Sequence, residues 1–303
     1  MRRMGMADYT ERRLSRSAGW SRRLAAFSAV LFVVSGIGHR YGFLDTTGFI
    51  PVLGIVALLA IAALLLSARA FYRLWHHSDR GGRDLSVGAL IALIVLTPFA
   101  LMAYLAFTRP VLTDISTDVE DPPALRFAAG ARTPDMNPLG TYDDDQRRAQ
   151  LEGYPLVTGR RYDLGEDGVM AAISTIIENR GWRVVRPWRV SQIDTSIEAL
   201  AHTSVLAFPQ DVALRVINEG QSTYVDMRSA SRYGGHDLGD NAARIRAFLA
   251  DLDVEISSLA GVAPAEPAEP ELAPTETEPG LIPLPEPRPG TGAVLDRSED
   301  PLD

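Results

Sequence analysis

Residues 49–68, FIPVLGIVALLAIAALLLSA, decide the fold of the first third of the chain, because no charged side chain interrupts these twenty residues. About 20 apolar residues in a helix span the hydrocarbon core of a bilayer, where a helix satisfies its own backbone hydrogen bonds. Similar stretches run from Leu85 to Phe107 and, shorter, from Leu24 to Ile37. The sequence therefore predicts an all-α membrane module within residues 1–109. Its three transmembrane helices are expected at residues 22–43, 48–69 and 85–107.

The shortest stretch has an alternative interpretation as the core of a secretory signal peptide, since it follows a basic segment. His39 and Arg40 end it directly. However, no cleavage pattern of small residues follows, and Tyr41, Phe43 and Leu44 extend the span. Arg40 can reach the polar interface through its long side chain. We therefore expect an uncleaved first helix.

Arginines are concentrated on one side of the apolar stretches. Seven arginines precede the first stretch and four lie between the second and the third, whereas the connection after the first has Arg40 alone. Loops rich in arginine stay in the cytoplasm. We therefore expect a multi-pass protein of a bacterial inner membrane, with the N-terminus in the cytoplasm and the residues after Phe107 in the periplasm.

Lysine and cysteine are absent from the 303 residues, and all thirty basic residues are arginine. Without lysine there is neither Schiff-base chemistry nor the phosphate-binding lysine of a P-loop. Without cysteine there is no disulfide, thiolate nucleophile or cysteine metal ligand. The net charge is −8, and residues 262–303 account for all of it with ten acidic residues and two arginines. The rest of the chain is neutral, so we expect no nucleic-acid partner.

The remaining residues divide into three expected regions. Residues 110–153 should form an extended strap (Val111–Phe127), a loop and a short polar helix that starts at the acidic run 143–145, where carboxylates complement the helix dipole. Residues 154–255 should form one soluble α+β domain. Residues 256–303 are rich in proline and acid and cannot bury a core, so a disordered tail is expected.

The soluble domain shows two helical patterns around several strand-like segments. Apolar residues repeat at helical spacing from Val169 to Ile177, and a second stripe of this period runs from Leu238 to Leu252. The order predicts an antiparallel sheet of about four strands with both helices on one face. The expected strands are Trp182–Trp188, Ser196–Leu206, Asp211–Ile217 and Thr223–Ser229.

Two runs in this domain are distinctive: IEALAHTSVLAFPQDVALRV from Ile197 and VDMRSASRYGGHDLGDNAARIRAFL from Val225. Together with DISTDVEDPP (Asp114–Pro123) and the pair Tyr154-Pro155, they resemble the family catalogued as domain of unknown function 1499. The resemblance covers residues 111–253, and several members are similar to this chain in placing membrane helices first. The resemblance implies no activity, since the family name declares none.

The chain departs from the family's pattern at two positions. Gln210 stands where the resemblance implies a second acid beside Asp211, and His202 stands where an arginine is common. The departure at Gln210 weighs against both a metal-binding and an acid–base role for the acid pair.

Strand parity gathers charged side chains on the sheet face that points away from the expected helices. Three interpretations remain open for this face: a structural network of cross-strand ion pairs, a site for a polar or anionic ligand, or a catalytic site. The charged residues assigned to it are Glu198, His202, Asp211, Arg215, Asp226 and Arg228.

The segment before the last helix is the sharpest candidate for an anion site. Its hydroxyls, guanidinium groups and glycines precede a helix N-terminus, which is what phosphate or carboxylate binding requires. In the competing interpretation Asp237 caps the helix, Asp240 completes a capping box, and the arginines pair with the protein's own carboxylates. The candidate ligand-binding residues are Arg228, Ser229, Ser231, Arg232, Asp237 and Asn241. Asn241 is also suited to anchoring the loop by hydrogen bonds.

Catalysis is the weaker expectation. A serine nucleophile would combine Ser229 or Ser231 with a histidine and Asp226, but the chain has no GxSxG elbow. The adjacent pair His76-His77 is poorly placed to share a metal on a helix. We expect no catalytic residue, metal or cofactor.

The expected function is that of an envelope binding or scaffold module beside the lipid bilayer, with an envelope protein or an anionic small ligand as partner. A hydrolase-type enzyme acting on an envelope-derived anionic substrate is the alternative.

Overall fold

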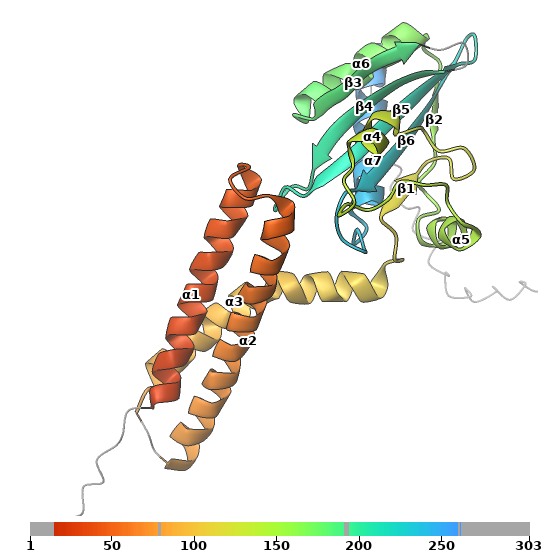
Figure 1. Cartoon of the computed structure of the whole chain (residues 1–303). Helices are drawn as coiled ribbons and strands as arrows, with labels where there is room; N and C mark the ends of the chain where they lie inside the picture. The colour runs from red at the N-terminus through yellow and green to blue at the C-terminus, as the bar shows by residue number, and fades with distance from the viewer. Residues whose placement is uncertain (1–14, 78–79, 191–193, 260, 262–303) are drawn as a thin grey trace, which may run out of the picture. The chain divides into compact units, whose positions relative to one another are not determined.

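The computed structural model describes residues 15–77, 80–190, 194–259 and 261. Within this range the chain forms a module of long helices and an α+β domain (Figure 1). The expected disordered tail lies outside the described residues, apart from its first few positions, and so do the arginines at positions 2–13.

The N-terminal module consists of α1 (Arg16–Arg40), α2 (Thr46–His77) and α3 (Gly82–Thr108). All three helices are long and apolar enough to cross a membrane, so the prediction of three apolar helices is confirmed. The helix α2 continues past its expected end at residue 69, because Arg69 and Arg73 interrupt the apolar run while retaining good helix propensity.

Small residues bring the three helices close together. Ala25, Ala63 and Ala92 form one buried cluster, with one alanine from each helix. At Gly88 of α3, an added Cβ would lie 2.8 Å from the backbone nitrogen of Arg22 in α1. Small side chains permit such close backbone approach between membrane helices, where packing rather than water exclusion drives association.

Replacing Gly88 by leucine should therefore destabilise the module by about 1–3 kcal/mol, because two of the three nearest atoms belong to the backbone of Arg22 and cannot move aside. Gly54 in α2 supplies the matched control, since an added Cβ would meet no atom within 4 Å. Thermal unfolding of the purified full chain in detergent should show a lower Tm for Gly88→Leu than for Gly54→Leu. Equal values would contradict the close packing.

The domain is built on an antiparallel sheet with the order β1-β6-β5-β4-β3, in which β2 also pairs with β6. The six strands are β1 (Asp114–Ser116), β2 (Arg160–Tyr162), β3 (Arg183–Val190), β4 (Thr195–His202), β5 (Pro209–Asn218) and β6 (Thr223–Ser231). The expectation of about four strands was wrong. Both additional strands have only three residues, too few to show an alternating pattern, and they pair with successive parts of one edge of β6.

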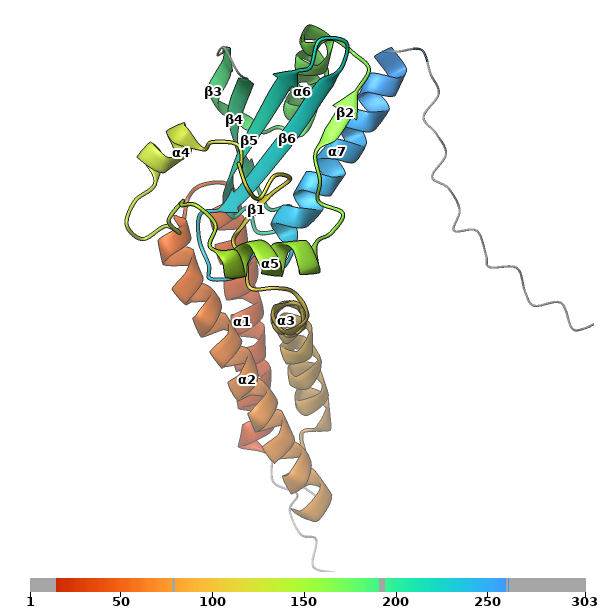
Figure 2. The same cartoon turned by 90° about the vertical axis from the view of Figure 1, so that its right-hand side faces the viewer.

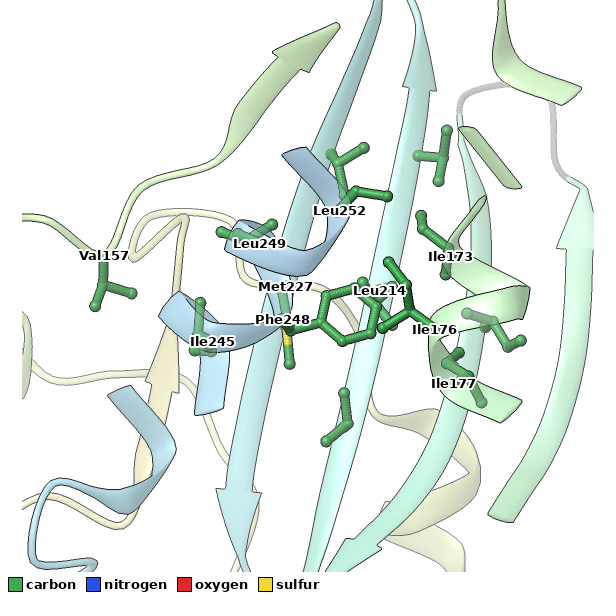
Figure 3. Close-up of a cluster of buried hydrophobic side chains, with 14 of the residues drawn as sticks. Val157, Ile173, Ile176, Ile177, Leu214, Met227, Ile245, Phe248, Leu249 and Leu252 are labelled. Atoms are coloured by element: carbon green, nitrogen blue, oxygen red, sulfur yellow. The ribbon is translucent and has the colours of Figure 1, made fainter. Parts of the chain in front are cut away.

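The helices α6 (Glu166–Asn179) and α7 (Asp240–Leu259) cover one face of the sheet. Figure 3 shows Leu214 and Met227 of the sheet against Ile177 of α6 and Phe248 of α7. These side chains belong to a single buried cluster, so the expected placement of both helices agrees with the core.

The opposite face carries the segment that precedes the domain. We call residues 111–125 the strap, which contains β1. The strap is followed by α4 (Arg126–Ala131). The sequence had instead predicted that the strap continues to Phe127 and is followed by a loop. Figure 2 shows α4 and α7 on opposite sides of the sheet. The polar helix α5 (Asp144–Gly153) is present as expected, with Asp143 as its N-cap in a capping box.

Candidate functional site

The six residues of the expected anion site do not converge, because β6 sends successive side chains to opposite faces of the sheet. Ser229 and Ser231 are buried on the face that α7 covers, where both contact Asn241. Arg228 lies on the strap face and contacts Asp114. The sequence grouped these residues by proximity along the chain, whereas strand parity separates them.

On the helix face, the buried amide of Asn241 joins three segments. Its Oδ1 accepts from the Ser229 hydroxyl at 2.8 Å. Its Nδ2 donates to the Ser231 hydroxyl and to the carbonyl of Thr113, each at 3.0 Å. The expected anchoring role of Asn241 is therefore present, and it ties the start of the strap to α7.

Asp237 caps the start of α7. Its carboxylate accepts from the backbone N–H groups of Gly239 at 2.9 Å and Asn241 at 3.1 Å. Burial raises the pKa of Asp237. The helix begins at Asp240 rather than at Leu238, because Leu238 adopts a left-handed conformation with φ of 57°. The protein's own carboxylate thus occupies this helix N-terminus.

On the strap face, Arg228 pairs with Asp114 of β1. Its Nη2 and Nε donate to the Asp114 carboxylate at 2.6 and 3.0 Å, and its guanidinium lies 5.4 Å from the ring centre of Tyr142. Burial alone would lower the pKa of Arg228, but the hydrogen bonds and charge of Asp114 outweigh it and raise that pKa. The Tyr142 hydroxyl donates to the same carboxylate at 2.8 Å.

Asp211 is 1% exposed and binds two arginines. Arg232 donates to it at 2.7 and 3.0 Å, and Arg132, which directly follows α4, donates at 2.8 and 3.0 Å. The neighbouring Gln210 points to the other face and donates to Asp240 at 2.9 Å. An acid at position 210 would therefore not share a metal with Asp211, which removes the structural basis for an acid pair.

The strap also neutralises the centre of the charged face. Arg215 donates to Asp226 at 2.8 Å and to Asp121 of the strap at 2.7 Å. Thr117 of the strap donates to Asp226 at 3.0 Å, and Asp226 is fully buried. Burial alone would lower the pKa of Arg215, but these carboxylates raise it.

Two residues of β4 were expected on this face: Glu198, which lies in the middle of the strand, and His202, which is its last residue. Glu198 is 2% exposed and accepts from the backbone N–H groups of Phe127 and Ala128 at the start of α4, with Arg186 at 3.3 Å. His202 is exposed at the end of β4. Partial burial and the charges of nearby arginines lower the pKa of His202.

Asp211→Ala should destabilise the protein by about 3–5 kcal/mol, because it leaves two buried guanidinium groups without their carboxylate. The matched control is Asp251→Ala, which removes an equally short pair with Arg180 whose carboxylate is 54% exposed and which should cost about 0–1 kcal/mol. Chemical denaturation of the full chain in detergent measures both. Similar small losses for the two variants would show that the network is not a structural requirement.

One part of the charged face remains open. A cleft of about 610 Å³, which we call the sheet cleft, lies between the strap and the strands β3 to β6. Arg126 and Arg189 line it and are exposed, and within the described part of the chain neither has an ion pair. Arg186 and Arg215 line it too, but they are engaged by Glu198 and by Asp226.

Pairing irregularities in β3 bring two of these arginines into the cleft. The register with β4 shifts between Val184 and Arg186 and again between Arg186 and Arg189. Strict alternation would send residues three apart to opposite faces, but the shifts let Arg186 and Arg189 line the same cleft. Sequence reasoning missed both, although Pro187 within a strand is a signal for such an irregularity.

The described residues contain no group of three or more histidine, aspartate or glutamate side chains arranged to hold a metal ion. The chemistry available in the sheet cleft is instead that of guanidinium donors beside carboxylates, which suits recognition of an anionic group.

Residues 114–252 match the model of the family described as "Protein of unknown function (DUF1499)". The resemblance based on the runs from Ile197 and Val225 is thereby confirmed. No curated protein and no solved structure matches the chain.

Proposed function

We propose that this chain, whose residues 114–252 belong to the DUF1499 family, is a membrane-anchored binding module that holds an anionic ligand in the sheet cleft. The observation that carries the proposal is that two arginines of the cleft, Arg126 and Arg189, differ from the other arginines that line it. Arg215 and Arg186 are held by carboxylates, whereas Arg126 and Arg189 face the cleft without an ion pair within the described residues.

The lining of the cleft limits the ligand that fits. Guanidinium groups match phosphate and carboxylate oxygens in pairs of hydrogen bonds. Asp118 and Asp121 on the strap side add acceptors, so a ligand with hydroxyl or ammonium groups beside its anionic group is favoured. The supporting network is rigid, because the strap is fixed to the sheet through Asp114, Thr117 and Asp121.

Binding without catalysis is favoured over the hydrolase alternative by the position of the serines. Ser229 and Ser231 are buried against Asn241 on the helix face, while Asp226 lies on the strap face. A serine nucleophile needs its base and its carboxylate within hydrogen-bond reach on one side of the sheet.

The three long apolar helices support a membrane location, and the arginine distribution supports an orientation. We place the chain in a bacterial inner membrane with its DUF1499 domain in the periplasm. The reason is that arginines cluster around the N-terminal end of α1 and around the connection between α2 and α3, from Arg69 to Arg83.

Reporter fusions test this orientation. A cytoplasm-active reporter joined after Gly82 should be active, and a periplasm-active reporter joined after Gly261 should be active. The reverse pattern would contradict the orientation and every assignment of compartment that depends on it.

Anion binding in the sheet cleft should appear as stabilisation of the full chain in detergent by phosphate or glycerol phosphate, compared with chloride at equal ionic strength. Ligand at 100 times its Kd adds about 2.7 kcal/mol. The double variant Arg126→Ala/Arg189→Ala should lose this increase in Tm. Neither arginine has an ion pair within the described residues, so the variant should keep most of its basal stability.

Arg148→Ala is the control, since Arg148 is an exposed arginine of α5 outside the sheet cleft. It should retain the full response to phosphate. A parent protein without a phosphate response, or a double variant with an unchanged one, would contradict the proposal.

A further inference from the structure

A second cleft, of about 840 Å³, lies where the end of α1 meets the domain. We call it the junction cleft. Its lining includes Arg40 and Tyr41 at the end of α1, Arg180 after α6, His202 at the end of β4, and Arg244 of α7. None of these side chains takes part in the sheet cleft.

The two walls of the junction cleft are fixed to each other by polar and aromatic contacts. Arg40 donates to the carbonyl of Ser204 at 2.7 Å, and His39 lies 2.6 Å from the carbonyl of Leu206. The ring of Phe208 lies 5.2 Å from that of His39. The connection between β4 and β5 therefore rests on the end of α1.

The junction cleft carries an excess of positive charge. Three arginines line it, but Asp240 is its one lining carboxylate, and that carboxylate is held by Arg244 at 2.7 Å. Arg180 is paired with Asp251 outside the lining. Arg40 has only carbonyl partners among the described residues.

The surroundings of His202 agree with this excess of positive charge. Its pKa is lowered by burial and by the electrostatic effects of Arg183, Arg232, His39 and Arg244, and no carboxylate is among the causes. A group that faces three guanidinium groups in this way lies in a positive potential.

The end of α1 also has the side chains of a membrane interface. Tyr41 and Phe43, directly after the helix, are 70% and 87% exposed. Aromatic side chains gather at the level of the lipid headgroups, and Val33, Val34 and Ile37 expose apolar surface one to two turns earlier in α1. With α1 across a bilayer, the junction cleft opens at the headgroup level.

We propose that the junction cleft binds the phosphate group of an anionic membrane lipid, with Arg40 as its principal ligand. The acyl chains of this lipid remain in the bilayer beside α1. Arg40 keeps free N–H donors after its bond to Ser204, since a guanidinium carries five. This inference is independent of ligand binding in the sheet cleft, because the two clefts share no lining residue.

The test uses the full chain in lipid nanodiscs made of phosphatidylcholine alone or of phosphatidylcholine with phosphatidylglycerol. Native mass spectrometry after transfer to detergent counts the phosphatidylglycerol molecules retained by each chain. The parent should retain phosphatidylglycerol in preference to phosphatidylcholine. Arg40→Gln should lower this retention about tenfold, as expected for the loss of one charge-assisted hydrogen bond.

Three variants serve as controls. Arg40→Lys keeps the charge and should keep most of the retention, which separates charge from folding. Arg22→Gln, in α1 far from the junction cleft, should retain the lipid as the parent does. Arg126→Ala/Arg189→Ala should also retain it, so failure of the sheet cleft is distinguished from failure of this site.

Glycerol phosphate is added to the Arg126→Ala/Arg189→Ala variant in nanodiscs of phosphatidylcholine alone, so that the sheet cleft does not contribute to the response. This arm separates a lipid from a free anion at the junction cleft. If it raises the Tm as much as phosphatidylglycerol does, the lipid assignment is overturned. Equal retention of the two lipids by the parent, or an equal loss in Arg40→Gln and Arg22→Gln, also overturns the proposal.

Discussion

Charge buried on the strap face of the sheet constrains the rest of the domain. Asp211, Asp226 and Glu198 are almost completely buried there, and an unpaired carboxylate in such a position would be strongly unfavourable. Their partners come from segments far away in the sequence, including the strap and the start of α4. The domain therefore depends on residues 111–132 as much as on its sheet and two helices. The family match, which begins at residue 114, includes residues 114–132 of this covering segment.

This constraint also decides which polar residues remain available for a ligand. The arginines that the sequence marked most clearly, Arg228 and Arg232, are occupied by Asp114 and Asp211. The arginines left at the edges of the network, Arg126 and Arg189, line the sheet cleft. Arg40 stands apart at the end of α1, where it contacts the connection between β4 and β5. In the proposed function, stability and recognition use the same residue type in different places, in a chain that contains no lysine.

Local patterns predicted the parts of the structure that local physics controls. Hydropathy located the three long helices, and alternation placed Asp211, Arg215 and Asp226 on the sheet face away from α6 and α7. The short strands β1 and β2 were missed because their pairing with β6 is a long-range contact. The helix α4 was missed for the same reason, since Glu198 of β4 binds its first N–H groups. In the candidate site, Arg186 and Arg189 were missed, because the register shifts of β3 break the strict alternation that the sequence prediction assumed.

A double-mutant cycle between Asp114 and Arg228 tests most directly the claim that ion pairing joins the strap to the sheet. Asp114→Asn, Arg228→Gln and the double variant would be compared with the parent by chemical denaturation of the full chain in detergent. Residues in direct contact show interaction energies of about 0.5–3 kcal/mol, and exposed pairs about 0.2–1 kcal/mol. The two side chains are 15% and 7% exposed, so we predict a coupling above about 1 kcal/mol. A coupling indistinguishable from zero would contradict the claim that this ion pair holds the strap on the sheet.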